Sequence, residues 1–164
     1  MLIYLDTCCI QRPLDDRLQP RIDLEAEAIL AVLDLIESGA VRLLSSQVIE
    51  IEIRRIPDSK RRRRIHAMEM ISLADTVAAL SNAAYTKAKE IELNPKRVAL
   101  GIEEPTFDAL HAAVAIEYHA DYFCTTDDRF LRKLKALRKR KALDWGLLPY
   151  FVSPLELAAE IIPR

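Results

Sequence analysis

Short apolar runs separated by longer segments of mixed polarity predict strands that alternate with helices along the chain. Residues 2–5 form an apolar run that ends at Asp6, which is typical of a buried strand. Residues 41–44 and 122–125 have the same character, and we expect a strand in each. Residues 77–80 are ambiguous between a short strand and other structure, and residues 150–152 suit an edge strand.

The segments between these runs carry apolar side chains at helical spacing. Residues 21–38 predict a long helix that Gly39 is suited to end. Ser45 or Ser46 can cap a second helix, which carries Glu50 and Glu52 and stops before Pro57. Further helices are expected over residues 58–73, 81–93, 107–119 and 127–140, with a short one after Pro154. The segment marked by Pro13 and Pro20 is expected to be a loop. Strands that alternate with helices predict an α/β fold with a mainly parallel sheet.

The length and composition fit one globular domain over residues 1–164. Hydrophobic residues make up 51% of the chain and charged residues 30%, a balance that supports a packed core and argues against disorder. With three glycines in the chain, neither a P-loop nor a dinucleotide-binding glycine motif can be written anywhere in it.

The cysteines and the apolar segments indicate in which cellular compartment the protein is expected. Cys8, Cys9 and Cys124 are odd in number and two of them are adjacent, which is a poor disulfide framework and favours a reducing environment. We expect no signal peptide and no membrane span, because no apolar run has the required length and flanks. A cytoplasmic protein is therefore expected.

Two basic runs stand out against a net charge of −1. Residues 60–64 read KRRRR, and residues 132–141 read RKLKALRKRK. Local basic patches can hold phosphates even when acidic residues elsewhere balance the total charge. The alternative for each run is a solvated helix face without a ligand.

Acidic residues stand where a parallel sheet would place a ligand site. Asp6 and Asp127 follow two of the expected strands, and Asp108 stands in the first turn of a helix with an alanine-rich face. The carboxyl ends of parallel strands share one edge of the sheet, which is where ligands bind in such folds. Helix capping explains any one of these acids, but it does not explain several at one edge. Clustered carboxylates favour Mg²⁺ or Mn²⁺, and two such ions ~4 Å apart can promote phosphodiester hydrolysis.

Four segments together resemble the PIN-domain nucleases, in the order in which that family has them. They are YLDT at residues 4–7, the serine and glutamate of residues 46–52, DALHAA from Asp108 and TTDDRF from Thr125. The resemblance covers essentially the whole chain and implies a three-layer α/β/α fold. The most similar branch contains the toxin subunits of VapBC-type toxin–antitoxin pairs.

The resemblance implies an acidic metal site whose members can be carried over one by one. The catalytic, metal-holding acids fall on Asp6, Glu52, Asp108 and Asp127, with Glu50 as the alternative to Glu52. Thr7 and Thr125 supply hydroxyls for the metal or the substrate. Two positions depart from the family pattern, because Cys8 replaces a small polar residue and Arg129 replaces an acid.

The other conspicuous side chains fit structural roles better. His111 lies three residues after Asp108, on the same helical face, and could touch the substrate. A core position, or one behind the metal-binding residues, is the more common role for such a histidine. No histidine or lysine is placed to activate Cys8 or Cys9 as a nucleophile, so burial is expected for both.

These observations predict a ribonuclease that uses Mg²⁺ or Mn²⁺, in which metal-bound water attacks the phosphorus atom. Arg61, Arg62, Arg63 and Arg64, and the second run at residues 138–141, are expected to contact the RNA backbone. The resemblance also implies an antitoxin partner. The segment with Ile65 and Met68 could instead form a homodimer interface, and we expect a homodimer. The alternative function is a catalytically silent PIN-like module that binds RNA or a protein.

Overall fold

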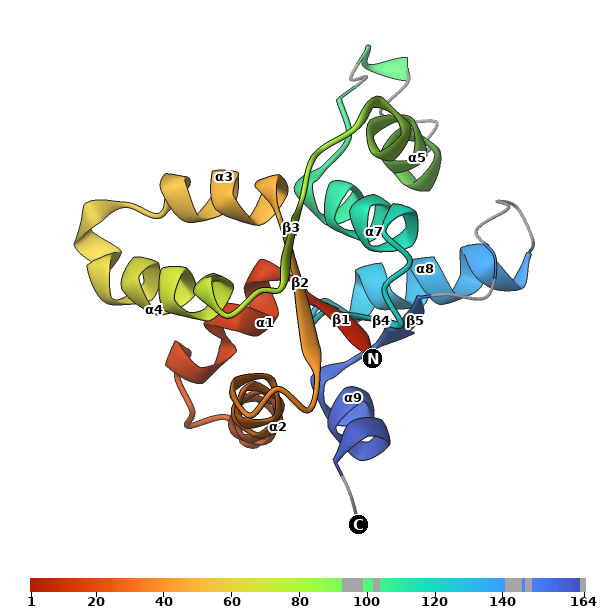
Figure 1. Ribbon diagram of the computed structural model, residues 1–164. Helices are drawn as coiled ribbons and strands as arrows, with labels where there is room; N and C mark the ends of the chain where they lie inside the picture. The colour runs from red at the N-terminus through yellow and green to blue at the C-terminus, as the bar shows by residue number, and fades with distance from the viewer. Residues whose placement is uncertain (93–98, 102–103, 141–145, 147–148, 163–164) are drawn as a thin grey trace.

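A parallel sheet of five strands forms the centre of the molecule. The computed structural model describes residues 1–92, 99–101, 104–140, 146 and 149–162 (Figure 1). The strand order is β3-β2-β1-β4-β5, and every neighbouring pair is parallel. The strands are β1 (Leu2–Leu5), β2 (Arg42–Ser46), β3 (Thr76–Ala78), β4 (Tyr122–Cys124) and β5 (Tyr150–Val152).

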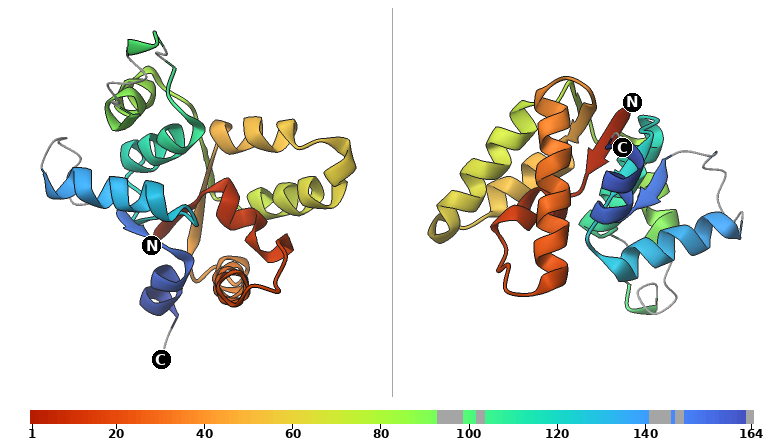
Figure 2. Two further views of the ribbon diagram at one scale, coloured as in Figure 1. Left: turned by 180° about the vertical axis from the view of Figure 1, so that it is seen from behind. Right: turned by 90° about the horizontal axis from the view of Figure 1, so that it is seen from below.

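Helices connect the strands and cover both faces of the sheet. They are α1 (Thr7–Gln11), η1 (Arg12–Leu14), α2 (Pro20–Glu37), α3 (Gln47–Arg55), η2 (Asp58–Lys60), α4 (Arg61–Ser72), α5 (Asn82–Glu92), α7 (Phe107–Glu117), α8 (Asp128–Lys139) and α9 (Pro154–Ile161). Helices α2 and α9 pack together on one side of the sheet, and α7 and α8 lie on the other side (Figures 1 and 2). The predicted three-layer α/β/α fold with a parallel sheet is therefore confirmed.

The central strand β1 shows why the strands of this sheet appear in the sequence as continuous apolar runs. Ile3, Tyr4 and Leu5 are fully buried, because helices cover both faces of this strand. Strand β1 pairs with β2 on one side and with β4 on the other, with Tyr4 opposite Leu44 and Phe123. A parallel strand buried on both faces carries continuous apolar residues rather than an alternating pattern. None of the helices in the described ranges is long and apolar enough to cross a membrane.

The segment after β1 is helical, so the loop predicted there is wrong for residues 7–14. The Asp6 carbonyl accepts hydrogen bonds from the backbone N–H groups of Cys9, at 2.9 Å, and Ile10, at 3.1 Å. Burial of Cys9 and Ile10 stabilises this single short turn against the core. The other ambiguous segment is strand β3, which begins at Thr76 and pairs with the end of β2.

The strand order fixes where a ligand site can form. The chain leaves β1 towards β2 and later returns on the other side of β1 to form β4, so the order changes direction between β1 and β4. Ligands bind at such a point, outside the carboxyl ends of the strands. Helices α1 and α3 begin directly after β1 and β2, and both lie at this edge (Figure 1).

Candidate active site

Asp6 is fixed at the carboxyl end of β1 by its backbone and its side chain. Its N–H donates to the Cys124 carbonyl at 3.0 Å and continues the pairing of β1 with β4. Its Oδ2 accepts from the Thr125 hydroxyl at 3.0 Å and from the Cys8 thiol at 3.3 Å. The residue is 4% exposed. Asp6 thus presents a carboxylate in one orientation at the position where β1 and β4 end.

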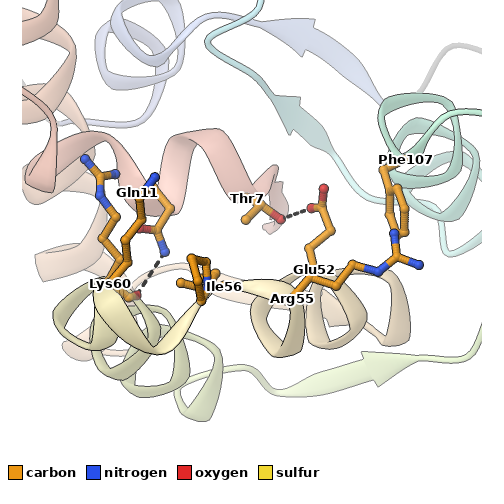
Figure 3. A pocket seen from close by; sticks show the side chains of 9 residues that line it. Thr7, Gln11, Glu52, Arg55, Ile56, Lys60 and Phe107 are labelled. Carbon is orange, nitrogen blue, oxygen red and sulfur yellow. Dashed lines mark hydrogen bonds between the residues drawn. The ribbon is translucent and has the colours of Figure 1, made fainter.

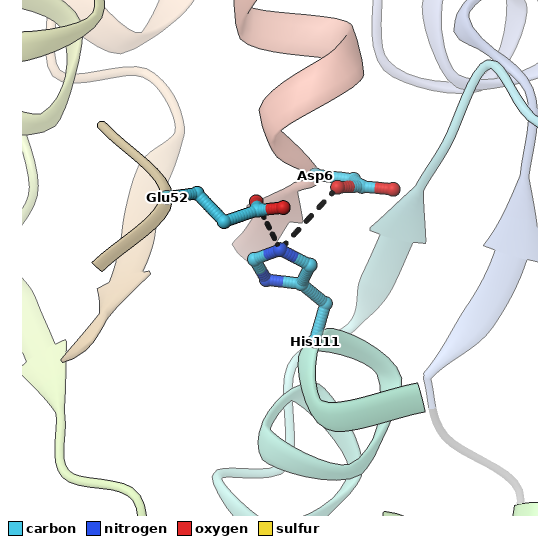
Figure 4. Close-up of side chains that lie close together, drawn as sticks. All are labelled: Asp6, Glu52 and His111. Carbon is cyan, nitrogen blue, oxygen red and sulfur yellow. Dashed lines mark hydrogen bonds and ion pairs between the residues drawn. The ribbon is translucent and has the colours of Figure 1, made fainter. Parts of the chain in front are cut away.

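Glu52 reaches the carboxyl end of β1 from α3, a helix that is capped at its N-terminal end. Ser46 ends β2 and caps α3, because its hydroxyl accepts from the Ile49 N–H at 3.3 Å. Glu52 lies in the second turn, where its Oε2 accepts from the Thr7 hydroxyl and lies 2.7 Å from His111 Nε2 (Figures 3 and 4). The structure therefore brings Glu52, rather than Glu50, to Asp6.

His111 lies between these two acids and is completely buried on α7. Its Nε2 is 2.7 Å from Glu52 Oε2 and 3.6 Å from Asp6 Oδ1 (Figure 4). On the other side of the ring, Nδ1 is 2.7 Å from the Tyr4 hydroxyl, which is 2.6 Å from Ser46 Oγ. A buried chain of polar groups therefore links the cap of α3 to its own glutamate.

The two acids and the histidine perturb one another. Burial opposes a charge on His111, but the negative charges of Asp6 and Glu52 outweigh it and raise the pKa of the imidazole. Burial also opposes a charge on Glu52, but hydrogen bonds from His111 and Thr7 lower the pKa of that carboxyl below its usual value. Glu52 is therefore an ionised carboxylate at neutral pH.

Asp108 lies in the first turn of α7, which Thr106 caps, and interacts electrostatically with Asp6, Glu52 and His111. Burial raises the pKa of Asp108 to about 6, and the negative charges of Asp6, Asp127 and Glu52 contribute in the same direction. The folded protein therefore holds this carboxylate in a partly buried position beside three like charges.

Asp127 is the most exposed of the four acids and has a structural use. It is the N-cap of α8, where its Oδ1 accepts from the Phe130 N–H at 2.9 Å. Its own N–H donates to the Thr125 hydroxyl at 3.1 Å, which links it to Asp6 through a shared partner. Capping therefore accounts for one carboxylate oxygen of Asp127.

The donor set fits a hard divalent cation. Asp6, Glu52 and His111 each offer a ligand atom, and these atoms lie within 4.8 Å of one another. Asp108 and Asp127 add negative charge near Asp6, and the two threonine hydroxyls add neutral oxygen. Mg²⁺ and Mn²⁺ take carboxylate and hydroxyl oxygens of this kind, and a bound cation would offset the repulsion among these carboxylates, which adds to the effect of burial on the pKa of Asp108.

The expected phosphate-binding arginines divide into two pairs. Arg63 donates to the Leu14 carbonyl at 3.0 Å and to Asp15 at 2.9 Å, and Arg64 forms an ion pair with Asp58 at 2.8 Å. Arg61 and Arg62 are exposed.

In the second run, Arg138 lies over the Phe151 ring, with its Cζ 4.3 Å from the ring centroid. Lys141, at the end of that run, lies outside the described residues.

The sequence interpretation missed the partners that hold the site in place. The sequence places Tyr4 in a strand and in the YLDT motif, and Ser46 as a possible cap and a motif serine, but it does not predict that the two hydroxyls meet each other and His111 in the core. The only local signal is a phenol and a hydroxyl at strand positions that become fully buried, which calls for a polar partner. His111 occupies the core position expected for it, and Cys8 is partly buried beside Asp6.

Comparison with known proteins identifies the family to which this geometry belongs. The sequence model of the PIN domain matches residues 3–136, so the chain belongs to the PIN-domain family and the resemblance seen in its motifs is confirmed. The convergent acids described above therefore lie in a fold whose resemblance is to nucleases. A comparison with curated proteins gave no match.

Two solved structures share the fold at low sequence identity. One is VapBC2 from Rickettsia felis bound to a DNA fragment from its promoter, with 14% identity, a TM-score of 0.53, and coverage of 93% of this chain and 98% of that one. The other is FitAB bound to an IR36 DNA fragment, with 17% identity, a TM-score of 0.51, and coverage of 93% and 94%. Both likenesses concern the fold of nearly the whole chain.

Proposed function

We propose that this PIN-domain protein is a metal-dependent endoribonuclease. The observation that carries the proposal is the meeting of the Asp6 and Glu52 carboxylates at the carboxyl edge of the sheet, with ligand atoms within 4.8 Å of one another. Asp108 adds a carboxyl group whose pKa is raised by burial and by the charges of the same neighbours. A site with this excess of negative charge suits a cation and the phosphate groups that a cation attracts.

Asp6, Glu52, Asp108 and Asp127 are the residues that would hold Mg²⁺ or Mn²⁺. When bound, such an ion polarises phosphate oxygens and lowers the pKa of coordinated water. Thr125 orients the Asp6 carboxylate, and Thr7 orients Glu52. His111 is a positioning residue that acts through Glu52, and Tyr4 acts through His111 and Ser46 from inside the core. Specificity for RNA over DNA rests on the resemblance to PIN-domain ribonucleases.

We also propose that the protein is the toxin of a toxin–antitoxin pair in the cytoplasm. Support comes from the motifs, which resemble the VapBC toxins, and from the shared fold with chains of the VapBC2 and FitAB structures. An antitoxin partner and a homodimer stay predictions. Co-expression with the product of a short neighbouring gene, followed by copurification and a growth assay, tests the partner.

The enzymatic proposal is tested by cleavage of single-stranded RNA in Mn²⁺, with a DNA strand of the same sequence beside it. Asp6→Asn should abolish cleavage, because it removes a charge from the cation site while keeping the shape of the side chain. Asp34→Asn, on the exposed side of α2, is the matched control and should cleave like the parent. Cleavage that survives Asp6→Asn or excess chelator rejects the mechanism, and RNA binding without cleavage by the parent favours the silent module.

A further inference from the structure

A groove beside the acidic cluster contains features that the proposed chemistry does not use. Its volume is about 390 Å³, within the range of roughly 300–1,000 Å³ that is usual for sites of small ligands. Glu52 and Thr7 lie in its middle, with Arg55 and Phe107 on one side and Lys60 and Gln11 on the other (Figure 3). The groove thus passes the acidic site instead of ending there.

On one side of Glu52, an arginine guanidinium lies over an aromatic ring. The Arg55 guanidinium carbon is 4.7 Å from the centroid of the Phe107 ring, and the Phe107 ring is half-buried (Figure 3). Arg55 is exposed, and within the described part of the chain its guanidinium forms no ion pair. Aromatic rings and guanidinium planes are the surfaces on which proteins stack unpaired bases.

The other side of Glu52 is cationic. Lys60 is exposed and has no carboxylate within ion-pair distance among the residues that the structure describes. Arg63 also lines the groove, where Asp15 and the Leu14 carbonyl hold its side chain in place. Asp15 balances the charge of Arg63, so Arg55 and Lys60 are the two cations that line the groove without an ion pair among the described residues, against the single carboxylate of Glu52. This charge favours a phosphate backbone and disfavours a basic protein segment.

We propose that single-stranded RNA lies along this groove, with one base stacked on the Arg55–Phe107 pair and a backbone phosphate on Lys60 and Arg63. The inference rests on the proposed function, because it places the RNA so that the strand passes Glu52 between these two contacts. The order of the features predicts that the base beside Phe107 and the phosphate beside Lys60 flank the bond that is cut.

Binding can be measured separately from cleavage in an Asp6→Asn background. The probes are a fluorescein-labelled oligoadenylate of eight nucleotides and a strand of equal length that lacks bases, titrated by fluorescence anisotropy. Phe107→Leu should weaken oligoadenylate binding about tenfold, because base stacking on one aromatic side chain is worth about 1–3 kcal/mol. It should leave the base-free strand unaffected, and Phe107→Tyr, which keeps an aromatic face, should bind both strands like the parent.

The cationic side has a different expected readout. Lys60→Gln should weaken both strands equally and reduce the dependence of log K on log salt by about 0.7, the value for one phosphate contact to a single strand. Arg42→Gln is the matched control, because it removes one exposed positive charge at the opposite edge of the sheet. It should change neither the affinity nor the salt slope.

The outcomes separate this inference from the proposed function. A Phe107→Leu protein that keeps the parent's preference for the strand with bases overturns the stacking contact. Equal loss in Phe107→Leu and Phe107→Tyr, on both strands, also overturns it, because the ring would then have a structural role. If every groove variant binds RNA like the parent, the groove does not bind RNA and the inference is wrong. A protein partner would then be the expected occupant of the groove. Failure of the parent to cleave RNA would contradict the proposed function, but the binding test described here would still apply.

Discussion

Asp108 offers a test of the acidic cluster that does not depend on activity. The fold raises the pKa of this carboxyl to about 6, through burial and the charges of Asp6, Asp127 and Glu52. The substitution Asp108→Asn keeps nearly the same side-chain shape and removes the charge. The replacement should therefore remove repulsion from the metal-free protein and stabilise it at neutral pH, although it removes a residue of the proposed active site.

The direction and size of the effect follow from the shift. An aspartate whose folded-state pKa lies above its value of about 3.9 in an unfolded chain destabilises the fold as it ionises. The penalty is absent below about pH 4, grows as the pH rises through about 6, and is constant above that. A shift of about two pKa units corresponds to about 3 kcal/mol. Because Asp108 is only partly buried, solvent screening reduces the expected gain to about 1 kcal/mol.

Thermal unfolding in chelator provides the assay. At pH 7.5 the Asp108→Asn protein should melt about 2–4 °C higher than the parent, and the two should melt together near pH 4. Saturating Mn²⁺ should reverse the order, because a bound cation stabilises the parent more than the variant. Asp34→Asn, an exposed replacement on α2, should show no such pH dependence. Equal or lower stability of Asp108→Asn at pH 7.5 in chelator, or a gain that persists at pH 4, would refute the electrostatic argument.

Three further predictions use other parts of the structure. Glu52→Gln should abolish Mn²⁺-dependent cleavage and Glu50→Gln should not, and equal activity of the two variants in a gel assay would remove Glu52 from the site. Tyr4→Phe should lower the free energy of unfolding by about 2 kcal/mol in urea, because it leaves the buried His111 Nδ1 without a partner and removes the bond to the Ser46 hydroxyl. An unchanged midpoint contradicts this. Joint replacement of Arg61 and Arg62 by glutamine should flatten the salt dependence of RNA binding without changing the mass in light scattering. A changed mass with an unchanged salt slope would instead assign this part of α4, with exposed Ile65 and Met68, to a homodimer interface.

Features encoded within a few residues could be predicted from the sequence. Strand β1 with Asp6 at its end, and Ser46 as one of two possible caps for α3, need only an apolar run and a hydroxyl at the correct spacing. The carboxyl edge then brings Asp6 and the end of β4 together without further information, because parallel strands share that edge.

Features that depend on tertiary contacts could not be predicted. Helix α1 spans five residues and is too short to show periodicity, so its stability comes from the burial of Cys9 and Ile10. The bond between Tyr4 and His111 joins residues 107 positions apart, and nothing near either residue indicates the other. Arg55 and Phe107 meet only because α3 and the start of α7 lie side by side.

The hydrogen-bond chain from Ser46 through Tyr4 and His111 to Glu52 begins and ends on the same helix. Its links run through the core, so the Glu52 carboxylate loses its rotational freedom when the protein folds and has little left to lose when a ligand arrives. The outward side of α3 contributes no residue to this hydrogen-bond chain, and Ile51 and Arg54 are exposed there. Substitutions on that side can therefore change what the protein contacts while the carboxylate keeps its place.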